Sequence, residues 1–181
     1  EQSKTKTFYI DTKAPTIDNI GISPAEGIKN FKQSEKDWYS GNVVLKSTIT
    51  DNGSGVASYN VYDSTDGKNF TELATEQKLK GTRAIYTTNN LADGKHVIKI
   101  TAVDNVGNKT KNEEVKTITF YIDTKAPTVK DIEISPAKGT KNFKQSEKDW
   151  YSGNVVLKST ITDSGSGIKN VKVEHNYNNT G

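Results

Sequence analysis

Residues 30–51 read NFKQSEKDWYSGNVVLKSTITD, and the same stretch occurs again without change at 142–163. The flanking sequence repeats at the same offset of 112 residues, so that 42 of 50 positions are identical between 7–56 and 119–168. Self-similarity at a fixed period is typical of an array of repeats. A period of 112 residues is too long for a solenoid unit. It matches the roughly 100 residues of one β-sandwich domain.

This period divides the chain into three parts. Residues 11–122 form one complete unit. Residues 1–10 match the end of that unit in their last four positions and are predicted to be the last strand of a preceding repeat. Residues 123–181 cover strands A to C, the first half of a second unit that the period extends to about residue 234. Because half a sandwich leaves a bare sheet edge, we expect 123–181 to be cut from a longer array or covered by another chain.

The amino-acid composition is typical of a folded chain rich in strands, and it argues against a nucleic-acid partner and against membrane insertion. Apolar residues make up 31%, enough for strands with one wet face. The net charge is +3, with 25 basic and 22 acidic residues interleaved along the sequence. The sequence has no stripe of basic residues with aromatics among them, so we expect no nucleic-acid partner. No apolar run approaches the ~20 residues of a membrane span, so we expect no membrane insertion in this segment.

The chain contains no Cys, which excludes a disulfide framework and a thiolate metal site. This absence is typical of many Gram-positive surface proteins and equally of cytosolic ones. The first residue is Glu1 and no signal peptide is visible, so the chain is predicted to be an internal fragment.

The alternation of apolar and polar residues predicts seven short strands in 11–122 and no helix. Residues 25–36 are predicted to be a long polar loop, and a further strand is expected to begin at Phe70. The apolar positions of the other strands are Ile20 and Ile22; Val43, Leu45 and Ile49; Val56, Tyr59 and Val61; Ile85 and Tyr86; His96, Ile98, Ile100 and Ala102; Ile118, Phe120 and Ile122. This pattern predicts an all-β chain of immunoglobulin-like antiparallel β-sandwiches in tandem; a β-barrel is the alternative, which the tandem arrangement disfavours.

Three motifs resemble bacterial immunoglobulin-like surface repeats. Residues 93–108, DGKHVIKITAVDNVGN, are similar to the penultimate strand and turn of those repeats, and 120–128, FYIDTKAPT, to their last strand and linker. Residues 54–67, with Ser54-Gly55-Val56 and Asp66-Gly67, resemble their third strand and hairpin. The resemblance covers 11–122 and the available part of 123–181. It implies an extracellular, cell-surface or cell-wall setting in a bacterium, but the family serves both in adhesin stalks and as spacers of secreted glycan-degrading enzymes, so it does not fix function.

No catalytic arrangement is visible in the sequence. The chain has two His residues, His96 in an alternating strand and His175 near the end, and both are predicted to be structural or solvent-facing. Without a Cys or a Ser elbow, nucleophilic catalysis lacks its parts. A Lys–Asn cross-link is also disfavoured, because the last strand, 116–122, contains no Asn. We therefore expect no enzyme here.

A carboxylate cluster is the best chemical candidate. Asp11 begins the first predicted strand (strand A, with Ile20 and Ile22). Asp51 opens the turn between the second and third strands (the B–C turn, 51–55), and Asp104 opens the turn between the sixth and the last (the F–G turn, 104–108). These three points meet at one pole of an immunoglobulin-like sandwich. Ca²⁺ takes six to eight oxygen ligands, so the pole is a candidate calcium site at the joint between repeats, to which Asp123 and Asp163 contribute in the next unit. The alternative is that each Asp only caps its own turn, as Asp commonly does.

Trp38-Tyr39 recurs as Trp150-Tyr151 just before strand B. A flat aromatic pair can stack on a sugar, which makes Trp38 and Tyr39 a candidate ligand site. The alternative is that Trp38 closes one end of the core, since large aromatics bury much area.

The leading functional hypothesis is a non-catalytic spacer that projects a terminal domain from the cell, with neighbouring repeats as its partners. The alternatives are a module that binds a host glycan or protein, and an accessory domain of a secreted glycan-degrading enzyme.

Overall fold

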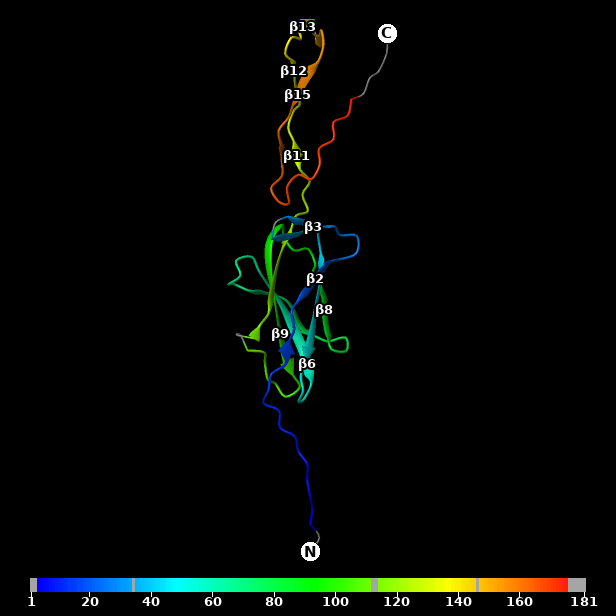
Figure 1. The fold of residues 1–181 in the computed structure, drawn as a ribbon. Helices are drawn as coiled ribbons and strands as arrows, with labels where there is room; N and C mark the ends of the chain where they lie inside the picture. Colours follow the sequence, from blue (N-terminus) through cyan, green and yellow to red (C-terminus); the bar gives the residue numbers. More distant parts are fainter. Residues whose placement is uncertain (1–2, 34, 112–113, 146, 176–181) are drawn as a thin grey trace. The chain divides into compact units, whose positions relative to one another are not determined.

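The computed structural model describes residues 3–33, 35–111, 114–145 and 147–175 (Figure 1). The chain divides into two compact units, Glu1–Thr124 (unit 1) and Lys125–Gly181 (unit 2). Throughout the described ranges the regular structure is β, and no helix there is long and apolar enough to cross a membrane. The predicted all-β class is therefore confirmed.

The described strands of unit 1 form two sheets. In the first, β5 (Val43–Thr50) pairs antiparallel with β1 (Thr16–Ile17), β2 (Gly21–Pro24) and β8 (Arg83–Thr87). The second has the order β3-β4-β10-β9-β6-β7, and its only parallel pair among the described strands is β4 with β10. Its strands are β3 (Asn30–Gln33), β4 (Lys36–Tyr39), β6 (Val56–Ser64), β7 (Thr71–Gln77), β9 (Gly94–Asp104) and β10 (Thr117–Ile122).

The core of unit 1 is built from the alternating apolar positions of both sheets. On β5 the residues alternate between buried and more exposed along its whole length, as expected of a strand with one wet face. Side chains of the second sheet complete the same cluster, and Val61, Ile98 and Phe120 are fully buried. Two sheets that share one apolar core are consistent with a β-sandwich.

Unit 2 repeats three strand pairings of unit 1 at the sequence offset. β11 (Thr128–Val129) pairs with β16 (Ile161–Thr162) as β1 pairs with the end of β5. β12 (Glu133–Pro136) pairs with β15 (Val155–Lys158) as β2 pairs with the start of β5, and β13 (Asn142–Gln145) pairs with β14 (Lys148–Tyr151) as β3 pairs with β4. The strand that is continuous in unit 1 is thus interrupted in unit 2.

The strands differ from the predicted set in two places. The predicted loop at 25–36 contains most of a hairpin, β3–β4; every β3 residue is exposed, so this strand has no buried face to mark it in the sequence. β1 forms a separate short strand before β2. The described residues of unit 1 therefore form ten strands where seven were predicted.

The spacing of Val56 and Tyr59, which is odd for one face of a regular strand, is explained by a register shift between Val56 and Ser58. A bulge inserts one residue and returns the following side chains to the same face.

Candidate functional site

The three predicted carboxylates of the pole lie together in unit 1. One carboxylate oxygen from each of Asp11, Asp51 and Asp104 lies within 4.8 Å of the others. Asp104 is buried, whereas the other two are partly exposed. The structure therefore brings together the three carboxylates that the sequence predicts at one pole.

Each carboxylate also caps a local turn. Asp51 Oδ2 accepts hydrogen bonds from the backbone N–H groups of Gly53 (3.1 Å) and Gly55 (2.7 Å). Asp104 Oδ1 accepts from the N–H groups of Val106 (3.0 Å) and Asn108 (2.8 Å). These are the bonds expected of Asp in turns, so the turn-capping alternative is part of the site.

The Asp11 side chain is hydrogen-bonded to the turn between β5 and β6, which holds the start of the unit to that turn. Its Oδ2 accepts from the Ser54 N–H at 2.7 Å and its Oδ1 from the Lys13 N–H at 3.1 Å. A Cβ added at Gly53 would lie 2.3 Å from Asp11 Cγ, so the carboxylate occupies space that only glycine leaves open. Asn108 Nδ2 joins the third segment by donating to the Asp11 carbonyl (3.2 Å) and to Asp104 Oδ2 (2.7 Å).

Hydrogen bonds favour the ionised form of Asp11. The pKa of Asp11 lies below its usual value, first because the Ser54 N–H stabilises the carboxylate, and then because the Lys13 N–H does so as well. Carboxylate oxygens gathered in this way are the ligand type of Ca²⁺. The same oxygens already accept backbone N–H groups, so calcium binding stays a prediction.

The remaining two predicted carboxylates fall in different units. Asp163 repeats the turn of Asp51, because its Oδ1 accepts from the N–H groups of Gly165 (3.0 Å) and Gly167 (2.7 Å). Asp123 belongs to unit 1, where its N–H donates to the Tyr39 carbonyl at 3.0 Å. Their joint role in a second calcium site stays a prediction.

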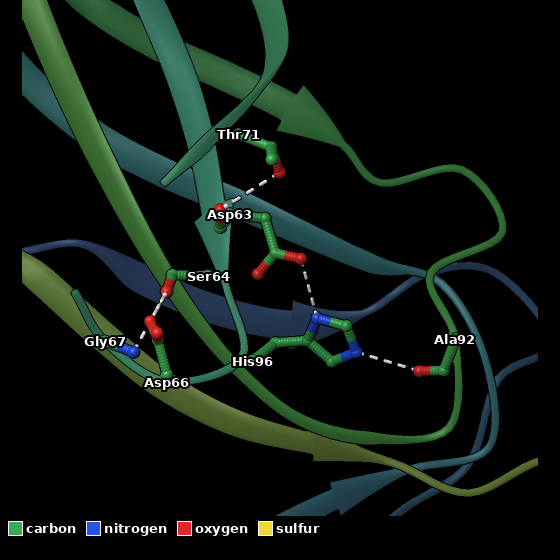
Figure 2. Close-up of polar contacts among 7 residues, drawn as sticks. All are labelled: Asp63, Ser64, Asp66, Gly67, Thr71, Ala92 and His96. Carbon is green, nitrogen blue, oxygen red and sulfur yellow. Dashed lines mark hydrogen bonds and ion pairs between the residues drawn. The ribbon is translucent and has the colours of Figure 1, made fainter. Parts of the chain in front are cut away.

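A buried ion pair lies in the second sheet of unit 1, and sequence reasoning missed it. His96 on β9 is 2% exposed and Asp63 on β6 is 8% exposed. Figure 2 shows the imidazole held between the Asp63 carboxylate, with Nδ1 at 2.9 Å from Oδ2, and the Ala92 carbonyl, at 2.8 Å from Nε2. The only sequence signal was a His at an inward position of an alternating strand; nothing marked its partner.

The two contacts fix the number of protons on this pair. A carbonyl oxygen only accepts, so Nε2 must carry a proton. The contact between Nδ1 and the carboxylate then needs a second proton between His96 and Asp63, which makes the pair an imidazolium with a carboxylate or their neutral tautomer. Burial disfavours the charge, but the hydrogen bonds to Asp63 and Ala92 and the Asp63 charge outweigh it and raise the His96 pKa.

The pair is enclosed and does not form a substrate site. The His96 ring stacks on Phe120 at 5.5 Å between centroids, which closes it toward the core. Asp63 Oδ1 is buried without a hydrogen-bond partner. The arrangement favours a structural role, joining β6, β9 and the loop before β9.

The burial of Trp38 and Tyr39 contradicts their interpretation as a sugar-stacking pair in unit 1. They are 8% and 4% exposed, respectively. Trp38 packs on Tyr121 at 4.9 Å between ring centroids, and Tyr39 meets the edge of Phe120 at 5.9 Å. Tyr39 therefore belongs to the core cluster, whereas Trp38 is buried outside that cluster, against Tyr121.

A scan against protein-family models and searches of curated proteins and of solved structures find no match to this chain.

Proposed function

We propose that this chain is a non-catalytic spacer segment of a bacterial cell-surface protein, built from immunoglobulin-like β-sandwich repeats that project a terminal functional domain. The recurrence of both the sequence and the strand pairings at an offset of 112 residues carries this proposal. A copied unit suits a role that depends on length and stiffness. The partners of each repeat are then its neighbours in the chain.

The way in which both ends of 11–122 are fastened supports a load-bearing role. β10 lies between β4 and β9 and pairs with both, so tension applied through Ile122 acts along the strand and loads these hydrogen bonds together. At the start of the unit, Asp11 is bonded through its carboxylate to Ser54 and through its carbonyl to Asn108. Force therefore enters and leaves the unit through segments that are hydrogen-bonded to their neighbours.

Calcium at the Asp11–Asp51–Asp104 pole would add to this role by stiffening the joint. The juxtaposition of the three carboxylates within 4.8 Å is the observation that favours it. Two other functions stay open: recognition of a glycan or host protein, and an accessory role in a secreted glycan-degrading enzyme. Burial of the Trp38–Tyr39 pair removes the aromatic surface on which the glycan alternative was based.

Force spectroscopy on a tandem protein made of several 11–122 units tests the proposal. We expect equally spaced unfolding events, each releasing about 37–40 nm of chain for the 112 residues of one unit, less the length of the folded unit. A glycan array probed with the same protein should show no binding. Extension without resolved force peaks would contradict a load-bearing spacer, and specific glycan binding would favour the alternative.

A further inference from the structure

The turn between β5 and β6 contains a chemically reactive pair of residues, Asn52-Gly53. Both residues are exposed. The backbone nitrogen of a glycine can attack the side-chain amide of a preceding asparagine, because glycine has no Cβ to hinder the approach and adopts the backbone conformations that the approach needs. No other Asn in the sequence is followed by Gly. This pair is therefore the point of the chain where such an attack meets the least hindrance.

The fold requires glycine at position 53. A Cβ there would lie 2.3 Å from Asp11 Cγ, so a larger residue would displace the carboxylate that holds the start of the unit. The Gly53 N–H donates to Asp51 Oδ2 at 3.1 Å, and the Gly55 N–H donates to the same oxygen at 2.7 Å. The nitrogen that would attack Asn52 thus makes the longer and weaker of these two hydrogen bonds.

The corresponding turn of unit 2 has the same cap but lacks the reactive amide. It reads Asp163-Ser164-Gly165, so Ser164 stands where unit 1 has Asn52. Asp163 Oδ1 accepts from the N–H groups of Gly165 (3.0 Å) and Gly167 (2.7 Å), as Asp51 does in unit 1. The turn therefore forms without Asn at this position, and the chain contains its own unreactive counterpart.

We propose that Asn52 is a site of spontaneous deamidation in the folded chain. The Gly53 nitrogen loses its proton to hydroxide and bonds to Asn52 Cγ, and the side-chain nitrogen leaves as ammonia. Water then opens the resulting cyclic imide at either carbonyl carbon, which restores the Gly53 N–H and leaves aspartate or isoaspartate at position 52. The net reaction consumes one water, releases one ammonia and lowers the formal net charge by one from +3.

The two products should affect the unit differently. Aspartate keeps the backbone of the turn and adds a carboxylate close to Asp11 and Asp51. Isoaspartate passes the main chain through the former side chain and so lengthens the turn by one carbon. The Ser54 N–H, which donates to Asp11 Oδ2 at 2.7 Å, lies directly after the lengthened segment, so we expect this product to weaken that bond. The inference depends on this turn and not on the spacer role.

Incubation of the full chain in weakly alkaline water labelled with heavy oxygen tests the proposal. After trypsin digestion in ordinary water, the peptide of residues 47–68 should carry one heavy oxygen at position 52, and the label separates this reaction from deamidation during digestion. The matched peptide of unit 2, residues 159–169, should carry none. The Asn52→Ser variant, which copies Ser164, should lose the label. The rate should rise with pH, because the attacking nitrogen must be deprotonated.

A second measurement follows the consequence for the fold. Ion exchange separates the products from the unmodified chain by their extra negative charge, and the Asn52→Asp variant provides the aspartate form alone. The isoaspartate form should unfold at a lower urea concentration than Asn52→Asp, because both carry the same charge and only the former lengthens the turn.

Three results would overturn the proposal. The first is an unlabelled position 52 in the folded chain after a time in which a synthetic peptide of residues 47–58 reacts completely in the same buffer. The second is label that is spread equally over other Asn residues or that persists at this turn in Asn52→Ser. The third is equal urea stability of the isoaspartate form and Asn52→Asp, which would contradict the coupling of the turn to Asp11.

Discussion

The buried His96–Asp63 pair should make unit 1 less stable as the pH rises above neutrality. In the unfolded chain His96 has a pKa near 6.5 and loses its proton around that pH. In the folded unit the pKa is raised, so the folded state keeps a proton that the unfolded state has released. The free energy of unfolding therefore falls with pH, from about 6.5 up to the folded pKa, with a slope of at most about 1.36 kcal/mol per pH unit for one proton.

The geometry explains why loss of the proton is costly. A neutral imidazole whose single proton points to Asp63 turns its Nε2 lone pair toward the Ala92 carbonyl, 2.8 Å away. Two acceptors then face each other in a buried place, which costs about 1–3 kcal/mol. Other shifted groups titrate outside this range, because Asp11 and Asp66 have lowered pKa values and Tyr39, Tyr59 and Tyr86 have raised ones.

Urea unfolding followed by Trp38 fluorescence, in a Trp150→Phe background, measures this effect between pH 5.5 and 8.5. The Asp63→Asn variant should reverse the slope. An amide donates to Nδ1 of a neutral imidazole, and burial without a carboxylate lowers the His96 pKa below 6.5, so stability then rises with pH up to that value. A wild-type stability that stays flat from pH 6 to 8.5, or an equal slope in both proteins, would refute the assignment of the extra proton.

Three further substitutions or conditions test the core and the pole. Phe120→Ala should destabilise unit 1 by about 3–5 kcal/mol in a urea melt, while Phe8→Ala, in the identical sequence context but exposed, should change it by less than about 0.5 kcal/mol; equal effects would contradict the packing described. Gly53→Ala should cost about 1–3 kcal/mol by driving a methyl group into the Asp11 carboxylate, whereas Gly21→Ala, whose Cβ meets its nearest atom at an ordinary 3.6 Å, should be near neutral. Millimolar Ca²⁺ should raise the melting temperature relative to EDTA if the ion binds only the folded pole, and this rise should disappear in Asp51→Asn; no shift in the wild type would remove the calcium hypothesis.

The sequence predicts the fold well where apolar alternation is tied to burial. β5, β6, β9 and β10 each carry their predicted apolar residues, because those residues form the core. It fails at β3, whose residues are all exposed and whose pairing with β4 depends on backbone hydrogen bonds that any sequence can make. A strand that is exposed on both faces has no periodic signal, so its composition alone predicts a loop.

The candidate site divides in the same way. Asp11, Asp51 and Asp104 were predictable because each opens a turn or strand whose place is set by the expected topology. The pairing of His96 with Asp63 was not, since it depends on cross-strand register: Asp63 is opposite Ile98, two residues along β9 from His96, and a bulge earlier in β6 sets that alignment. Register is decided by packing of the whole sheet and cannot be read from either strand alone.

The repeat itself separates what local sequence decides from what tertiary packing decides. The identical stretches 30–51 and 142–163 form the same hairpin and the same antiparallel pairs, so turns and local pairing follow from the sequence. The same residues nevertheless differ in burial, since Leu45 is 1% exposed and Leu157 is 47% exposed, and the strand that is continuous as β5 is broken into β15 and β16. Continuity of a central strand thus depends on neighbours on both sides, which β2 and β8 provide for β5. It follows that supplying a missing neighbour to unit 2 should extend its strands as well as cover its apolar residues.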